Sequence, residues 1–216
     1  MFKGISILEF QGWGRNWLTI SFVITILFDA AEAWEVRAQH TTISDAGEAK
    51  SVSTIWFCYF GFLLIALGVY GAVGVPGQIS IAMIGEGLLG AFFYLPMMRL
   101  LWKTRGYSST EKKVLIGSAA MVPIVLLLPW SDFWVTLFSG GAVIAAASMP
   151  FQIYKNKSRG QVELGLTLVY LANVFFWMIY GFSARILPLM IVSPMAVVLL
   201  LITIVFWFAY PKRYSI

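Results

Sequence analysis

LLIALGVYG at residues 63–71 and NVFFWMIYG at residues 173–181 are two apolar stretches that both end in Tyr-Gly. Each is followed by a short turn and a second apolar stretch that contains Met-Ile, namely ISIAMIGEGLLGAFF from Ile79 and LPLMIVSPMAVVLLL from Leu187. The hydrophobic sequence therefore contains two copies of one unit. A single three-helix unit cannot enclose a translocation path, whereas two copies can form one at their interface.

The composition is typical of an integral membrane protein. The 216 residues are 60% hydrophobic and only 12% charged, whereas soluble domains carry about 25% charged residues. A helix needs about 20 apolar residues to cross the hydrocarbon layer. Seven transmembrane helices are predicted from stretches of this kind, at 17–36, 52–74, 79–101, 114–130, 133–154, 164–184 and 186–210.

The repeat divides these helices into a 3+1+3 arrangement. A lead-in (1–16) precedes the first three-helix repeat (17–101), a loop and linker helix (102–132, helix 114–130) follows, and the second three-helix repeat (133–210) ends in a short tail (211–216). Because three helices per unit would invert the second copy, the added helix restores its orientation. The predicted fold is an all-α membrane protein with two parallel repeats, in which the uncharged linker helix carries little chemistry.

The distribution of Lys and Arg predicts the orientation. If the N-terminus lies outside, twelve of the 15 Lys and Arg residues face the cytoplasm, and only Lys3, Arg15 and Arg185 face the other side. This bias follows the positive-inside rule, and it predicts a cytoplasmic C-terminus in a plasma membrane or a bacterial inner membrane. It also accounts for the net charge of +5 without a nucleic-acid partner.

Two motifs in the second unit resemble a known family. SMPFQIYKNKSRGQVE at 148–163 contains a Pro-x-Gln triplet, and LANVFFWMIYGF at 171–182 matches the pattern Leu-x-Asn-x-x-x-Trp-x-x-Tyr through Asn173, Trp177 and Tyr180. In these motifs and in topology the chain resembles the SWEET sugar transporters and the wider PQ-loop superfamily, whose half-size bacterial relatives are called SemiSWEETs. The resemblance implies that Asn173 and Trp177 lie beside a sugar pocket.

The same resemblance implies further roles for residues of both units. Pro150 would be a helix-kinking hinge, with Gln152 as its spaced polar residue. The polar position on the last helix of each unit falls near Glu86 in the first copy and near Ser193 in the second. The first unit departs from the pattern, because it has Leu63 and Leu67 where the second has Asn173 and Trp177.

Three acidic residues within apolar stretches are candidate functional groups. Glu86 lies between Gly85 and Gly87, and carboxyls at such depth usually face a cavity or a partner. It could titrate a proton, accept hydrogen bonds from substrate hydroxyls or amines, or serve a structural hydrogen bond. Asp29 and Glu32 share a helix face near the expected cytoplasmic end of the first helix. They could form a gate or bind a coupling ion, or they could be an interfacial cluster that reaches water.

Asn173 and Trp177 also share a helix face, which Tyr180 adjoins. An amide and an indole could bind the hydroxyls and the C–H face of a sugar. The alternative is that Asn173 joins two helices by a hydrogen bond and Trp177 fills a gap. Substrate-binding residues are therefore predicted at Asn173, Trp177, Glu86, Tyr180 and Ser193, and gating or hinge residues at Pro150, Gln152, Asp29 and Glu32.

These observations predict a transporter that moves a small neutral polar solute, such as a sugar, by alternating access between the repeats through facilitated diffusion. The alternatives are a proton-coupled transporter of a vitamin, nucleoside or amine with the same fold, and a PQ-loop-like seven-helix receptor. No catalytic set or metal-ligand cluster occurs in the sequence, so neither an enzyme, a metal nor a cofactor is expected. The expected partners are the solute and the lipid bilayer, and a homo-oligomer is left open.

Overall fold

The computed structural model describes residues 6–47, 54–75, 78–158 and 164–210. Five of its helical stretches are long and apolar enough to cross a membrane, and a shorter apolar helix spans Ser131–Ala146. The protein is therefore an all-α membrane protein. The five stretches are Trp17–Asp45, Thr54–Gly74, Ile81–Arg105, Thr167–Ala184 and Leu187–Ala209.

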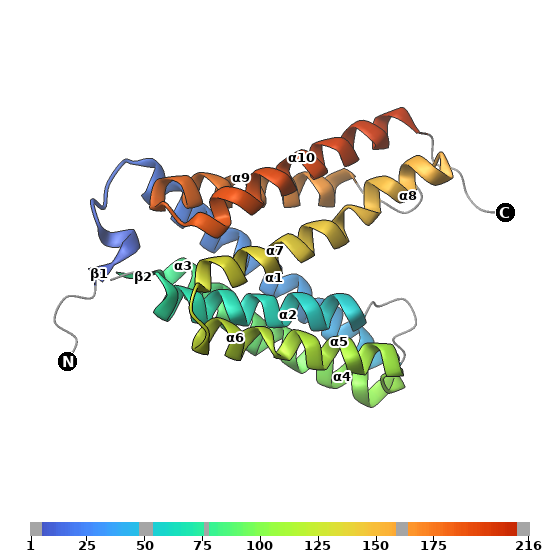
Figure 1. Cartoon of the computed structure of the whole chain (residues 1–216). Helices are drawn as coiled ribbons and strands as arrows, with labels where there is room; N and C mark the ends of the chain where they lie inside the picture. Colours follow the sequence, from blue (N-terminus) through green and yellow to red (C-terminus); the bar gives the residue numbers. More distant parts are fainter. Residues whose placement is uncertain (1–5, 48–53, 76–77, 159–163, 211–216) are drawn as a thin grey trace.

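The helices lie side by side in one elongated bundle (Figure 1). The elements are β1 (Ser6–Ile7), η1 (Leu8–Phe10), α1 (Trp17–Ala46), α2 (Thr54–Val69), η2 (Tyr70–Gly74), β2 (Gln78–Ile79), α3 (Ile81–Leu89), η3 (Gly90–Tyr94), α4 (Leu95–Arg105), α5 (Ser109–Ala119), α6 (Met121–Leu127), α7 (Ser131–Ala146), α8 (Ser148–Asn156), α9 (Leu164–Ala184) and α10 (Leu187–Ala209). We call its two ends the β1–β2 end and the α8 end.

The first long helix is longer than the sequence predicts. The expected end near residue 36 is wrong, because α1 continues to Ala46 and stops at Gly47, which has a φ of 64°. The added turns are polar but include the good helix formers Arg37, Ala38, Gln39 and Ala46, so the helix continues beyond its apolar part. Asp29 and Glu32 therefore lie near the middle of α1, not near its end.

Two of the expected helices are each broken into two pieces. α5 ends at Ala119 and α7 ends at Ala146, which are the residues four positions before Pro123 and Pro150. Proline has no N–H to bond the carbonyl four residues earlier, so each break occurs where that hydrogen bond is missing. Pro150 is buried at this break, whereas the side chain of Gln152 lies outside the described residues.

The helices pack in the same way within each sequence copy, and the two copies also contact each other. α3 packs against α1 and α2, and α10 packs against α7 and α9. Contacts between the copies pair α1 with α9 and α2 with α7. α5 and α6 pack against α2, on the lower side of the bundle in Figure 1.

Two hydrophobic clusters fill the bundle. The cluster toward the β1–β2 end joins residues of both sequence copies, including Tyr70, Met83, Val135 and Tyr180. Toward the α8 end, the buried members of the other cluster all lie between residues 36 and 107. In the described residues, the shared hydrophobic core is therefore concentrated at the β1–β2 end.

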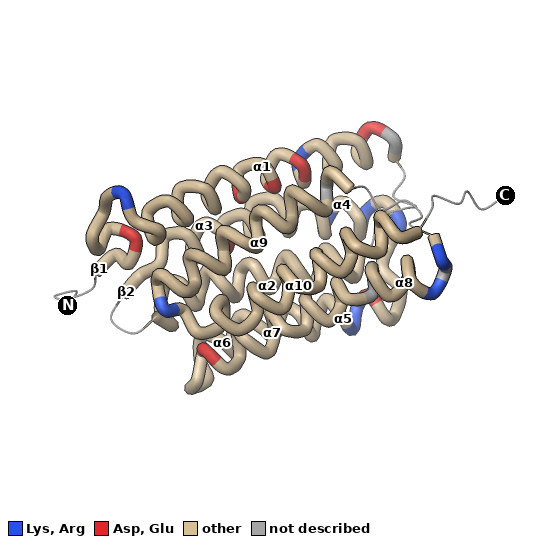
Figure 2. The backbone as a smooth tube through the Cα atoms, turned by 90° about the horizontal axis from the view of Figure 1, so that it is seen from above, with Lys and Arg blue, Asp and Glu red and all other residues tan. Residues whose placement is uncertain are grey.

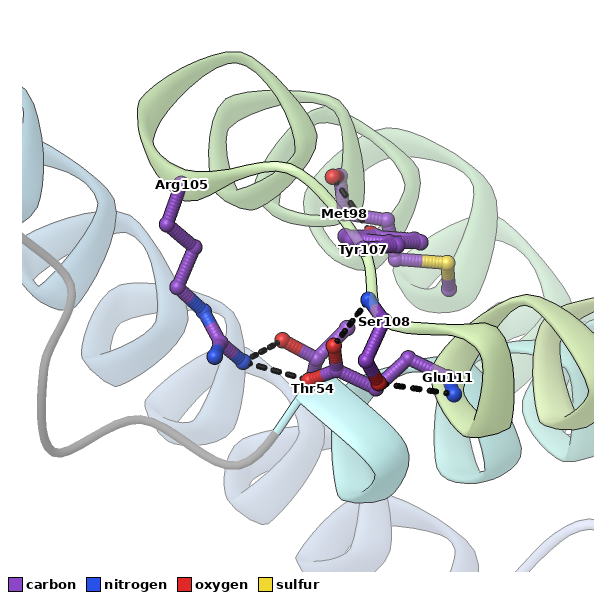
Figure 3. A network of polar contacts seen from close by, with 6 residues as sticks. All are labelled: Thr54, Met98, Arg105, Tyr107, Ser108 and Glu111. Atoms are coloured by element: carbon purple, nitrogen blue, oxygen red, sulfur yellow. Dashed lines mark hydrogen bonds and ion pairs between the residues drawn. The ribbon is translucent and has the colours of Figure 1, made fainter.

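A polar network fixes the junction of α4, α5 and α2 at the α8 end (Figure 3). Arg105 donates to Thr54 and to Glu111, the latter over 2.6 Å. Ser108 and Glu111 form a reciprocal capping box at the start of α5, which satisfies two of the helix's free N–H groups. The hydrogen bonds at the Glu111 carboxylate, first of all the one from the Ser108 backbone, lower the pKa of Glu111.

Candidate functional site

Glu9 is the most strongly bonded buried acid in the described structure. It lies in η1, ahead of the first long helix, and its side chain is 0% exposed. Its carboxylate accepts hydrogen bonds from the Ser80 hydroxyl (2.9 Å) and from the backbone N–H groups of Ile81 (3.0 Å) and Ala82 (3.1 Å). Glu9 therefore caps the N-terminus of α3, where the helix dipole favours a negative charge.

The same carboxylate reaches the second sequence copy through Tyr180. The Tyr180 hydroxyl donates to Oε1 of Glu9 over 2.5 Å and lies 2.8 Å from the Ser80 hydroxyl. β1 supports this position, because it pairs in parallel with β2 through Ser6–Gln78 and Ile7–Ile79. One buried acid thus joins the lead-in, α3 and α9.

A second tyrosine, in the first sequence copy, bonds an acid at the start of the second copy. Tyr70, which occupies the place of Tyr180 in the first Tyr-Gly copy, donates its hydroxyl to Asp132 at the start of α7. Each Tyr-Gly tyrosine therefore bonds an acid at or just ahead of the first helix of the other copy. We call Tyr180–Glu9 and Tyr70–Asp132 the paired latches, and both lie at the β1–β2 end.

A group of acidic side chains lies farther along the bundle. Asp29 and Glu86 are 6% and 7% exposed, and Asp29, Glu32 and Glu86 interact electrostatically. Glu32 accepts a 2.5 Å hydrogen bond from the hydroxyl of Tyr94. Figure 2 shows acidic positions midway along α1. The structure therefore brings together three acids that lie on two different sequence segments.

Asp29 and Glu86 present buried carboxyl oxygens that no other residue satisfies, although the two carboxyl groups are in hydrogen-bond contact with each other. Both oxygens of Asp29 and Oε2 of Glu86 are buried without a donor from any other described residue, as is Oδ1 of Asn173 on α9. Leaving a buried polar group unsatisfied costs about 1–3 kcal/mol, and more for a charged one. A bound solute with hydrogen-bond donors would satisfy these oxygens.

The glycines beside Glu86 position it by close packing. A Cβ added at Gly87 would lie 2.7 Å from the Cα of Gly68, so α2 and α3 touch through their backbones there. Gly85 faces α1 instead, where the side chain of Ile26 is 3.7 Å from the position of such a Cβ. These small residues allow α3 to lie between α1 and α2 with Glu86 directed toward Asp29.

The other predicted site residues lie in different surroundings. Trp177 is buried in the cluster at the β1–β2 end and packs edge-on against Tyr180, with ring centroids 5.4 Å apart. Ser193 is buried within α10, next to Pro194. Asn173 is partly buried on α9. Trp177 and Tyr180 thus belong with the paired latches, and Glu86 belongs with Asp29 and Glu32.

Sequence reasoning missed Glu9, Ser80, Asp132 and Tyr94. Glu9 had one available signal, because it is a single acid inside the apolar lead-in ISILEF. The repeated Tyr-Gly pair marked Tyr70 as the counterpart of Tyr180, but periodicity does not reveal partners that lie far away in the chain. In sequence comparisons no family model and no curated protein matches the chain.

Proposed function

We propose that this protein is a transporter that moves a small polar solute along the interface between two three-helix repeats, residues 17–101 and 133–210. The observation that carries the proposal is the pair of latches. Tyr180 and Tyr70 occupy the same place in the two Tyr-Gly copies, and each bonds an acid that comes just ahead of the other copy. A reciprocal exchange of this kind is expected when two like units face each other across an axis.

The helix neighbours support the 3+1+3 arrangement. In each proposed repeat the third helix packs against the first and second, and the second helix packs against the first helix of the other repeat. Parallel repeats related by an axis along the membrane normal would give this pattern. In this arrangement α5 and α6 form the linker helix, which packs on the first repeat through α2.

The two ends of the bundle differ in a way that suits alternating access. At the β1–β2 end, both latches and the shared hydrophobic cluster hold the repeats together. At the α8 end, the buried members of the hydrophobic cluster all lie between residues 36 and 107, and Lys157 bonds Tyr210 of its own repeat. The positive-inside rule places the β1–β2 end outside, so this conformation is closed to the outside.

The unsatisfied acceptors offer a place for the solute between these ends. Asp29, Glu86 and Asn173 present buried oxygens without donors, and a polar solute carries donors. A sugar-like solute, which the family resemblance implies, would provide hydroxyl groups. We propose facilitated diffusion, in which the solute moves down its own gradient without a coupling ion.

Uptake into liposomes tests the proposal. The purified protein would be reconstituted, and entry of labelled glucose, uridine, thiamine and methylammonium would be compared with entry into protein-free liposomes. We expect saturable, protein-dependent entry of at least one of them, and preloading with the same solute should accelerate it by exchange. The absence of protein-dependent entry for all four would refute transport.

The paired latches need a matched comparison in the same assay. Combined Tyr70→Phe and Tyr180→Phe substitutions remove both hydroxyls and should change the uptake rate several-fold, because closure of the outer end is weakened. Tyr154→Phe, an exposed tyrosine on α8, should leave the rate unchanged. Equal uptake rates in the latch variant and wild type would show that the latches play no part in the transport cycle.

A further inference from the structure

In the acidic group on α1 and α3, the buried acceptors outnumber the donors, even with a proton shared between Asp29 and Glu86. Asp29 contributes two unpartnered oxygens and Glu86 one, although both side chains are more than nine-tenths buried. Glu32 is the member that has a donor, the Tyr94 hydroxyl at 2.5 Å. The unmatched groups thus lie on facing sides of α1 and α3.

A fourth unpartnered acceptor lies on α9 at the same level. Phe28 on α1 stacks with Phe176 on α9, at a centroid distance of 6.5 Å, and Glu32 interacts electrostatically with Tyr170. Asn173 lies between Phe176 and Tyr170 along α9, just as Asp29 lies between Phe28 and Glu32 along α1. The unpartnered Oδ1 of Asn173 is therefore level with Asp29.

The chemistry of these acceptors restricts the ligand. All four unpartnered atoms are oxygens that accept hydrogen bonds, and three belong to carboxyl groups. A shared proton would satisfy at most two of them. A metal ion needs its ligands drawn close around it, and in the described part of the chain no three Asp, Glu, His or Cys side chains are grouped closely enough to hold one. A ligand with several N–H donors and a positive charge fits both conditions.

We propose that Asp29, Glu86 and Asn173 bind a small organic cation through its N–H groups, as a primary ammonium or a guanidinium group would provide. Such a group presents three to five donors and carries the charge that two buried carboxylates attract. The inference rests on the proposed function for its transport role, and it names a cationic solute where the family resemblance implies a neutral one. Binding itself can be measured without transport.

Equilibrium dialysis of labelled methylammonium against the purified protein tests the site. We expect saturable binding to wild type, with competition by guanidinium at millimolar concentration and none by acetamide, which is neutral and of similar size. Asp29→Asn and Glu86→Gln should each weaken binding about tenfold or more, as expected when a charge-assisted hydrogen bond is lost. Asp45→Asn removes an exposed acid from the end of the same helix and should bind like wild type.

The outcomes separate this inference from the proposed function. Binding of methylammonium without transport of any solute would uphold the cation site and refute the transporter. Transport of glucose, with no binding of methylammonium and no competition by it, would uphold the transporter and refute the cation site. If a carboxyl variant does not fold, the competition pattern on wild type still decides, because equal displacement by acetamide and guanidinium would overturn a cationic ligand.

Discussion

At the scale of single residues, Glu9 concentrates an unusual number of contacts in one buried carboxylate. Glu9→Ala would leave the donors of Ser80, Ile81, Ala82 and Tyr180 without their acceptor. We expect a loss of at least about 2 kcal/mol in the free energy of unfolding, because hydrogen bonds to a charged group are each worth about 1.5–3 kcal/mol. Thermal unfolding in detergent, followed by circular dichroism, would measure it.

Tyrosine substitutions provide the matched comparison for this prediction. Tyr180→Phe keeps the ring in its core position and removes only the hydroxyl that reaches Glu9, so it should be destabilising by about 1.5–3 kcal/mol. Tyr154→Phe removes a hydroxyl at an exposed site and should lie within about 0.5 kcal/mol of wild type. Equal effects at the two sites would mean that the Glu9 contacts contribute little.

Glu111, at the α8 end, should make the stability of the protein depend on pH. Its pKa is lower in the folded protein, so its contribution is present above the ordinary glutamate pKa of about 4.3 and is lost as the pH falls through the lower folded value. Glu111→Gln keeps a capping side chain but removes the titration. Between pH 7 and pH 3.5, the melting temperature of wild type should fall further than that of this variant. Parallel curves for the two proteins would contradict the role of Glu111.

At the scale of elements, α2 and α3 are held together by glycines at their contact. A Cβ at Gly68 would lie 2.5 Å from the Cα of Gly87, whereas a Cβ at Gly140 on α7 would meet no atom within 4 Å. Gly68→Ala should therefore cost about 1–3 kcal/mol by overpacking. Gly140→Ala should be neutral or stabilising by up to about 1 kcal/mol, because alanine favours the helix. Melting temperatures of the two variants that shift alike would contradict this account.

Helix positions could largely be predicted from hydrophobicity, whereas helix breaks and long-range partners could not. The apolar stretches predicted α2, α9 and α10 closely, since these helices are apolar along most of their length. The polar last third of α1, residues 37–46, was missed because it stays helical without being apolar. Among the candidate site residues, Glu86 and Asp29 stood out as acids in apolar segments, but Glu9 and Asp132 could not be linked to Tyr180 and Tyr70. Those partners are 171 and 62 residues apart in the chain.

At the scale of the whole molecule, the distribution of charge predicts how the bundle is inserted. The β1–β2 end should face outside and the α8 end, which includes Arg105 and Lys157, should face the cytoplasm. A reporter that is active only in the cytoplasm should give a signal when fused to the C-terminus and none when fused to the N-terminus. A signal from the N-terminal fusion, or silence from the C-terminal one, would reverse the orientation and with it the outside-closed interpretation.

The bond between Glu9 and Tyr180 also bears on how the protein is made. Glu9 leaves the ribosome well before Tyr180, one of its partners, which is made 171 residues later. Until α9 is inserted, the lead-in can bind only the start of α3, and its place beside the second repeat stays open. The lead-in therefore reaches its full set of contacts only after α9 is made, and a nascent chain stalled before α9 would be missing that connection.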